Sequence, residues 1–269
     1  MRAPGFTGVR KASAARKPGP YAWLAFGLLA YLAFAVSSLP AAAVYRFFAP
    51  QELRLLGVDG TLWSGGAALG SASGFPLHDI HWHIDASALL TGRLAGRVQA
   101  RLSDGFVDTR FSARPIGADL TALQASTSLP ALAALLPIKG IQGLVSLALG
   151  EVRFENGRLV AAVGQVRLSQ LAVPTLMPAG GRSEPVELGN YEIVFKDTGG
   201  RGIAAEFHDT GGPLQVSGTL SLDPKQRYEI KGLLAPRANA PKELVQGLEL
   251  VTGSPDAKGQ RAFSLTGSL

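Results

Sequence analysis

Cysteine is absent from this 269-residue chain. Its absence excludes disulfides, thiol nucleophiles, cysteine zinc sites and iron–sulfur clusters. A domain of this size can be held together by its hydrophobic core alone, so the absence of cysteine does not exclude an oxidising compartment. Charged residues are also scarce, at 17% against roughly 25% in typical soluble domains. The 33 glycines and 17 prolines favour many short strands joined by turns over a helical bundle.

Acidic residues are missing from residues 1–20, which carry five basic ones. These are Arg2, Arg10, Lys11, Arg16 and Lys17. The rest of the chain is nearly balanced, with 21 basic and 20 acidic residues. The basic charge therefore belongs to an N-terminal arm, and we expect neither a general nucleic-acid surface nor a nucleic-acid partner.

No charged residue occurs between Lys17 and Arg46. About 20 apolar residues match the roughly 30 Å hydrocarbon core of a bilayer, so residues 21–39 are predicted to form one transmembrane helix. Tyr21 and Trp23 stand at its basic end, where aromatic rings favour the membrane interface. Positive charge stays on the cytoplasmic side. We therefore predict a cytoplasmic arm at 1–20 and a domain at 45–269 in the periplasm of a Gram-negative envelope, anchored in the inner membrane.

A cleaved signal peptide is the alternative, because Ala41-Ala42-Ala43 offers an Ala-x-Ala cleavage site. The apolar block is longer than the usual 7–15 residues of such a peptide and is rich in Leu, Phe and Trp, which favours a retained anchor. Both alternatives deliver the residues from about 45 onward to the periplasm.

Alternation of apolar and polar residues dominates from about Val58 onward. Ile80 and Trp82 are expected on one face of a strand, with His81 and His83 on the other. Such strands indicate an antiparallel sheet packed on one side. The predicted fold class is mainly β: a transmembrane helix, then a curved, largely antiparallel sheet, as a half-barrel or a sandwich, with short helices.

Three short helices and one long loop are predicted within this region. A single turn is expected at 86–91, which Gly92 ends, and a short apolar helix at 129–136, which prolines flank. A third helix is expected at 241–251, where apolar residues recur at helical spacing. The segment at 175–190, rich in proline and glycine, is the expected loop and a candidate point of subdivision.

One segment is distinctive enough to suggest a family. It runs Leu56-Gly-Val-Asp-Gly-Thr-Leu-Trp-Ser-Gly-Gly-Ala-Ala-Leu69 and is followed by the strand of Trp82. With the anchor before it and the run 213–237 near the end, it resembles type II secretion system protein N. The resemblance implies a single-pass inner-membrane accessory component of the machine that exports folded proteins. It implies no catalytic residue, cofactor or metal. The strand texture is also similar to AsmA-like envelope proteins, whose curved sheets have an apolar inner face linked with lipid traffic.

A phosphate-binding loop and a nucleophile elbow are two other interpretations of the same segment. The segment has no Lys for a phosphate-binding loop, and Leu62 stands where a nucleophile elbow needs glycine. The plainer interpretation is a turn at Asp59-Gly60, a short strand that buries Leu62 and Trp63, and a Gly-Gly bend. We therefore interpret these residues as a family signature with a structural role. A docking surface for a partner is the alternative role. The signature comprises Gly60, Thr61, Leu62, Trp63, Ser64, Gly65 and, from the later strand, Trp82.

The histidine-rich strand is the most metal-like cluster. His81, His83 and Asp85 would share one strand face, and an H-x-H pair can chelate an ion. Solvated polar side chains explain the same pattern, and no third ligand is identifiable, so no metal site is predicted. Serine, histidine and aspartate occur in no recognised catalytic spacing, which predicts a protein that is not an enzyme.

Two functions follow as hypotheses. The first is a secretion component that contacts other subunits through edge strands or the Trp63 region. The second is an envelope lipid-handling module that uses the apolar face of the sheet.

Overall fold

The computed structural model describes residues 20–48, 53–72, 75–133, 140–174, 185–199, 202–251 and 254–268. The chain divides into two units, Met1–Leu39 and Pro40–Leu269, and each is described by itself. All but the last residue of the predicted basic arm, and residues 175–184 of the predicted loop, lie outside the described residues.

The first unit contains helix α1, Pro20–Ser37, which falls on the helix predicted from the apolar run. Its large apolar side chains are exposed, including Leu24, Phe26 and Phe34. The hydroxyls of Ser37 and Ser38 donate to the Phe34 carbonyl at 2.8 Å where the helix ends. Over the part of the chain that the structure describes, no helix combines the length and the apolar character needed to cross a membrane.

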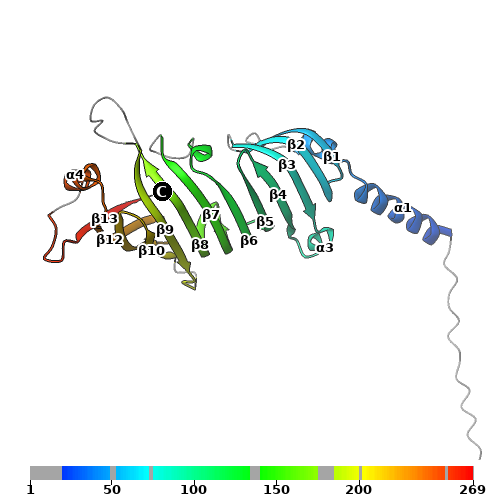
Figure 1. The fold of residues 1–269 in the computed structure, drawn as a ribbon. Helices are drawn as coiled ribbons and strands as arrows, with labels where there is room; N and C mark the ends of the chain where they lie inside the picture. The colour runs from blue at the N-terminus through cyan, green and yellow to red at the C-terminus, as the bar shows by residue number, and fades with distance from the viewer. Residues whose placement is uncertain are drawn as a thin grey trace, which may run out of the picture. The chain divides into compact units, whose positions relative to one another are not determined.

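The second unit is built from strands with few helices between them (Figure 1). The strands are β1 Leu53–Gly60, β2 Ser64–Ala72, β3 Phe75–Ile84, β4 Leu94–Leu102, β5 Gly105–Arg114, β6 Gly117–Ser128, β7 Gln142–Glu155, β8 Arg158–Val173, β9 Val186–Lys196, β10 Ile203–Gly211, β11 Leu214–Leu222, β12 Arg227–Pro236 and β13 Arg261–Ser268. The helices are α2 Ala41–Phe48, α3 Ala86–Leu89, the 3-10 turn η1 Pro130–Leu132 and α4 Lys242–Val251.

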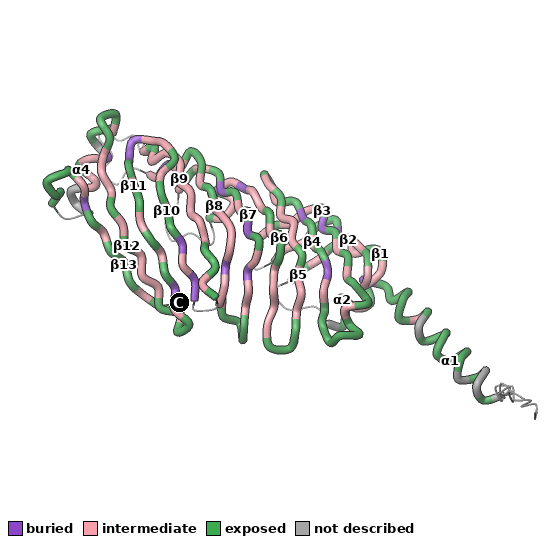
Figure 2. Tube along the Cα trace, turned by 90° about the horizontal axis from the view of Figure 1, so that it is seen from below, coloured by how far each residue is buried: buried purple, intermediate pink, exposed green. Residues whose placement is uncertain are grey.

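In the described residues, all thirteen strands belong to one sheet whose spatial order is the sequence order. Every neighbouring pair is antiparallel, so the sheet is a continuous meander, which Figure 2 shows along its length. The predicted mainly-β, antiparallel class is confirmed. The sandwich alternative is wrong, because the strands do not separate into two sheets. β8 and β9 pair on either side of the long-loop segment, so the sheet continues through that position.

Strand β3 shows why this sequence forms such a sheet. Ile80 is buried and Trp82 half-buried, while His81 and His83 between them are exposed, as alternation requires. A bulge at Asp79, with φ of +47°, restores this register after Leu77. One apolar and one polar face therefore recur from strand to strand.

The predicted short helices are present where the structure describes the chain. The turn expected at 86–91 is α3, and the helix expected at 241–251 is α4. Only η1 represents the helix expected at 129–136, since residues 134–136 are not among the described residues. Helix α2 was not predicted; it packs against β1, where the Tyr45 hydroxyl accepts the Leu55 N–H at 2.8 Å.

The sheet curls near its C-terminal end. A buried cluster joins Ala162 of β8 to Ile203 and Leu222 of β10 and β11, with Tyr228 of β12 packed against it. Across this curl the Gln226 side chain donates to the Leu159 carbonyl at 3.3 Å. Figure 1 shows β10–β13 passing behind β8 and β9. Strands far apart in the sheet therefore face one another.

Candidate functional site

The signature segment forms the turn between β1 and β2. Gly60 ends β1 with φ of +79°, and Ser64 begins β2. The Thr61 N–H donates to the Ser64 carbonyl at 2.9 Å, and the Ser64 N–H donates to the Thr61 hydroxyl at 3.2 Å. Thr61 also pairs with Pro40 in an isolated bridge. The threonine therefore closes the turn and ties it to the segment before β1.

Trp82 of β3 holds this turn from the neighbouring strand. Its indole N–H donates to the Leu62 carbonyl at 3.1 Å, and the Ile84 N–H donates to the Trp63 carbonyl at 2.7 Å. Trp82 lies opposite Gly65 in the register, and a Cβ at Gly65 would stand 2.6 Å from the indole ring. The signature residues are thus brought together, and glycine is required at position 65.

The local geometry corrects one sequence prediction. Leu62 and Trp63 lie in the turn and not in a short strand, while Gly65 and Gly66 lie in β2 and not in a bend. The reason is that β3 supplies the hydrogen bonds for the carbonyls of residues 62 and 63. The missing side chain of Gly65 then makes room for the Trp82 ring.

The histidine-rich strand remains a solvated polar face. His81 and His83 are both exposed, and His83 Nε2 stands 3.8 Å from Asp85 Oδ1. In the ranges that the structure describes, no three His, Asp or Glu side chains are grouped as a metal site would need. The strand face therefore offers a pair of polar groups to solvent.

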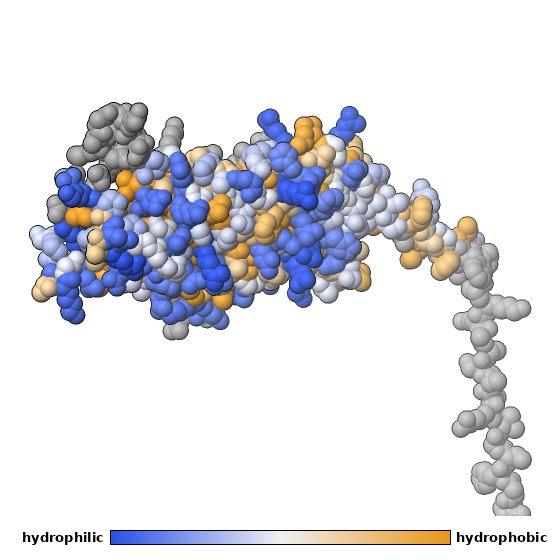
Figure 3. All heavy atoms as spheres, in the orientation of Figure 1, coloured by the Kyte–Doolittle hydropathy of each residue, from blue (hydrophilic) through white to orange (hydrophobic). Residues whose placement is uncertain are grey.

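The two faces of the sheet differ in chemistry. The outer face carries exposed cross-strand ion pairs, among them Arg97–Asp108 at 2.5 Å and Arg167–Glu192 at 2.9 Å. Hydrogen bonding from the Arg97 guanidinium, then from the Gln99 amide, and after these the Arg97 charge hold the pKa of the Asp108 carboxyl below its usual value. Figure 3 shows hydrophilic side chains spread over the face turned to the viewer. The outer face is therefore polar and faces solvent.

The opposite, inner face is apolar. Its buried residues gather in small clusters, one around Ala67, Ile80 and Ala100 and the other around Ala162 and Leu222. No large side chain of the described residues is fully buried, and most inner-face residues are half-buried. A second layer normally covers the apolar face of a sheet. In the described residues no second sheet covers this face, and the curl of the sheet covers the part around Ala162 and Leu222.

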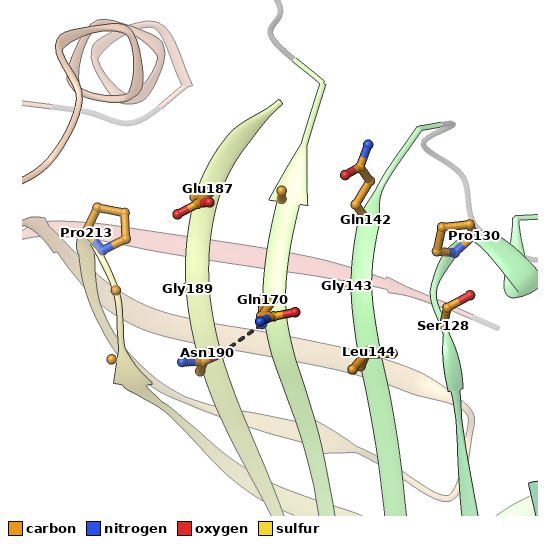
Figure 4. Close-up of a pocket in the computed structure, with 13 residues that line it drawn as sticks. Ser128, Pro130, Gln142, Gly143, Leu144, Gln170, Glu187, Gly189, Asn190 and Pro213 are labelled. Atoms are coloured by element: carbon orange, nitrogen blue, oxygen red, sulfur yellow. Dashed lines mark hydrogen bonds between the residues drawn. The ribbon is translucent and has the colours of Figure 1, made fainter. Parts of the chain in front are cut away.

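A hollow of about 820 Å³ lies where β7–β10 bulge near their ends (Figure 4). Register shifts cross these strands at Gly143, Gln170 and Gly211, and the Gln170 N–H donates to the Asn190 side-chain oxygen at 2.8 Å. Glu187 supplies the one charged side chain of this lining. The lining thus offers amide and hydroxyl side chains, backbone groups and one carboxylate, and these lining residues include no acid–base pair.

An ion pair next to this hollow joins three strand ends. Asp209 has a 7% exposed side chain; its two oxygens accept from Arg237 Nη2 at 2.6 Å and from the Val216 N–H at 2.8 Å. Arg237 also donates to the Gly212 carbonyl at 2.9 Å. The pair therefore fixes the turn between β10 and β11 against the end of β12.

Tyr191 provides a pH-dependent test of this region. Burial, and secondarily the Asp209 carboxylate, raises the pKa of Tyr191 from 10.0 to about 12. A raised folded pKa gives stability that is complete below pH 10 and lost as the pH rises toward about 12. Phenolate absorbance should therefore show one late-titrating tyrosine in the folded protein, and Tyr191→Phe should remove that component. A titration in which Tyr191→Phe removes an ordinary component instead would contradict this geometry.

The fold and site define a class: a single-sheet β protein with one apolar face, whose most distinctive residues hold a turn. Residues 51–264 match the family model of type II secretion system (T2SS), protein N. The chain belongs to this family, as its resemblance predicted. It is 29% identical to a type II secretion system protein N of Vibrio cholerae over 234 residues, covering 82% of this chain and 86% of the relative.

The protein of the same name from Aeromonas hydrophila is also 29% identical, over 242 residues, covering 87% of this chain and 92% of the relative. No solved structure matches the chain. The matched range includes the signature turn and Trp82. Family membership makes the chain a component of a secretion system.

Proposed function

We propose that the protein is a non-enzymatic accessory component of the type II secretion machinery, anchored in the inner membrane, that contacts other secretion subunits in the periplasm. The observation that carries the proposal is the family match over residues 51–264. The site geometry agrees with it, because the signature residues serve a turn and a packed indole and present no acid–base pair.

The proposed anchor is the apolar run at residues 21–39, with the basic arm in the cytoplasm. It is supported by the charge-free sequence from Lys17 to Arg46, which extends beyond both ends of α1, and by five basic residues before it. Alkaline extraction should leave the full chain in the membrane, while a chain from residue 40 should be released. Protease added to spheroplasts should cut the domain. Extraction of the full chain, or a domain accessible from the cytoplasmic side alone, would contradict this topology.

The proposed function predicts a secretion defect. A clean deletion should leave exported enzymes in the periplasm instead of the medium, and the full chain supplied in trans should restore their release. The matched control is the chain from residue 40 exported by a cleavable signal, which separates the domain from its anchor. Normal release in the deletion strain would count against the proposal.

A second candidate function is the binding of lipid acyl chains on the inner face, and the half-buried apolar residues of that face favour it. Native mass spectrometry of residues 40–269 purified from cells should then detect phospholipid or lipopolysaccharide. Leu147 is half-buried and belongs to the inner face, whereas the neighbouring Ser146 is exposed on the outer face. Leu147→Lys should remove the lipid and Ser146→Lys should retain it. Protein free of lipid, or equal retention by both variants, would rule this candidate out.

A further inference from the structure

The two ends of the sheet are protected differently. At the β1 end, the Tyr45 hydroxyl of α2 accepts the Leu55 N–H, and Thr61 pairs with Pro40. These contacts occupy backbone groups of β1 and its turn that β2 does not use. An exposed sheet edge is a template for pairing with another strand, and proteins normally block it. The β1 edge is at least partly blocked in this way.

Over residues 262–268, the described edge strand β13 lacks the charges, proline and bulges that usually protect a sheet edge. In the described part of the chain β13 pairs with β12 alone, through eight consecutive residue pairs without a register shift. Arg261 at its start is buried, but residues 262–268 contain no charge and no proline. Charged side chains, proline and bulges are the devices that blunt natural edges. The free side of β13 is therefore straight, uncharged and competent to pair.

One apolar row shows what the missing neighbour would cover. Phe195, Ala205, Leu220, Ile230 and Leu265 lie opposite one another across β9–β13. The exposed fraction is 2% at Ala205 in the middle of this row and 55% at Leu265 at the edge. An added strand with an apolar residue beside Leu265 would continue the row and remove that side chain from water.

The outer face beside the same edge contains a hollow of about 550 Å³. It lies between alternate residues of β11, β12 and β13, among them Lys231, Leu233 and Ala262, over the glycines at 218 and 232. The exposed outer-face residues of β13 are small, namely Ala262, Ser264, Thr266 and Ser268. A second copy paired through its own β13 would present these small side chains and leave the hollow open.

We propose that β13 is a docking edge for an extended segment of another secretion subunit, which pairs with residues 262–268. The segment has apolar residues toward the inner face and at least one large side chain toward the outer face, where it enters the hollow. This inference rests on the proposed function for the existence of a secretion partner. The position of contact follows from the edge itself.

Site-specific photo-cross-linking tests the position of contact. A photoreactive residue at Thr266 of the full chain, in cells expressing the whole secretion system, should capture one secretion subunit. The matched control is Thr121, which is also an exposed threonine but lies in the interior strand β6. A photoreactive residue there should capture no secretion subunit. The cross-linked peptide of the partner should be an alternating apolar strand.

Paired proline substitutions test the mode of contact. In an antiparallel pair, one of two successive residues directs its N–H and C=O to the neighbour and the next directs them away. Of Ser264→Pro and Leu265→Pro, one should destabilise the β12–β13 ladder. The other should keep the melting temperature and reduce the Thr266 cross-link about tenfold. Proline has no N–H to donate to the partner strand, and its ring clashes with the backbone of that strand.

The outcomes separate the two levels of the proposal. Capture of secretion subunits from Thr121 or elsewhere but not from Thr266 overturns the docking edge and leaves the proposed function standing. Capture of a second copy alone at Thr266 also overturns it. A Thr266 cross-link that survives both prolines overturns strand pairing. A further outcome is the capture of a non-secretion envelope protein at Thr266 that is abolished by the proline variant with the unchanged melting temperature. This outcome overturns the named partner and the secretion function with it.

Discussion

Trp82→Ala should lower the free energy of unfolding of residues 40–269 by about 3 kcal/mol, the lower end for aromatic truncation because the side chain is half-buried. The substitution removes the ring that packs on Gly65 and the indole N–H that satisfies the Leu62 carbonyl. It also leaves the buried Ile80 cluster without one of its neighbours. Urea unfolding followed by circular dichroism measures this effect.

Trp82→Phe is the matched control for this prediction. It keeps a single aromatic ring but loses the indole N–H and the distal part of the indole that packs on Gly65, so the expected loss is about 2 kcal/mol. The difference between the two variants measures the packing of the aromatic ring that Phe retains. If Trp82→Ala unfolds within about 0.5 kcal/mol of the parent, the indole does not hold the signature turn.

Asp209→Ala should cost about 2–3 kcal/mol, below the 3–5 kcal/mol typical of a broken buried pair because Arg237 is 39% exposed. The substitution strands the Val216 N–H and leaves the Arg237 guanidinium without its carboxylate at the end of β12. It should also bring the pKa of Tyr191 down, because the Asp209 charge contributes to raising that pKa. The same urea and absorbance titrations measure both effects.

The control for Asp209→Ala is Glu206→Ala, three residues earlier in the same strand, β10. Glu206 pairs with Lys196 on the outer face, where both side chains are more than half exposed. Exposed ion pairs contribute about 0–1 kcal/mol, so this variant should unfold almost like the parent. If Asp209→Ala and Glu206→Ala lower the free energy of unfolding equally, the Asp209–Arg237 pair does not fix the strand ends.

Period-two alternation predicted much of the fold because side-chain direction in a strand depends on neighbouring residues alone. The alternation of Ile80 and Trp82 with His81 and His83 placed the faces of β3 correctly. The choice between one sheet and two could not be made in the same way. It depends on which strands pair, and each of these strands would present one apolar face in either arrangement.

Bulges and the signature turn show the same limit. Asp79, Ala122 and Gln170 adopt positive φ values where the register shifts, and these positions depend on the partner strand. Leu62 and Trp63 read as strand residues because they are apolar. They lie in a turn because β3 satisfies their carbonyls. The pairing of Trp82 with Gly65 joins residues 17 positions apart, and local patterns in the sequence carry no signal for it.

The capture of neighbouring proteins tests the central claim most directly. The full chain, expressed at its native level, is cross-linked in intact cells, purified from solubilised membranes and analysed by mass spectrometry. The account predicts cross-links from residues 40–269 to periplasmic parts of other type II secretion subunits. Recovery of the protein with no secretion subunit attached, in cells that are actively exporting enzymes, would contradict it.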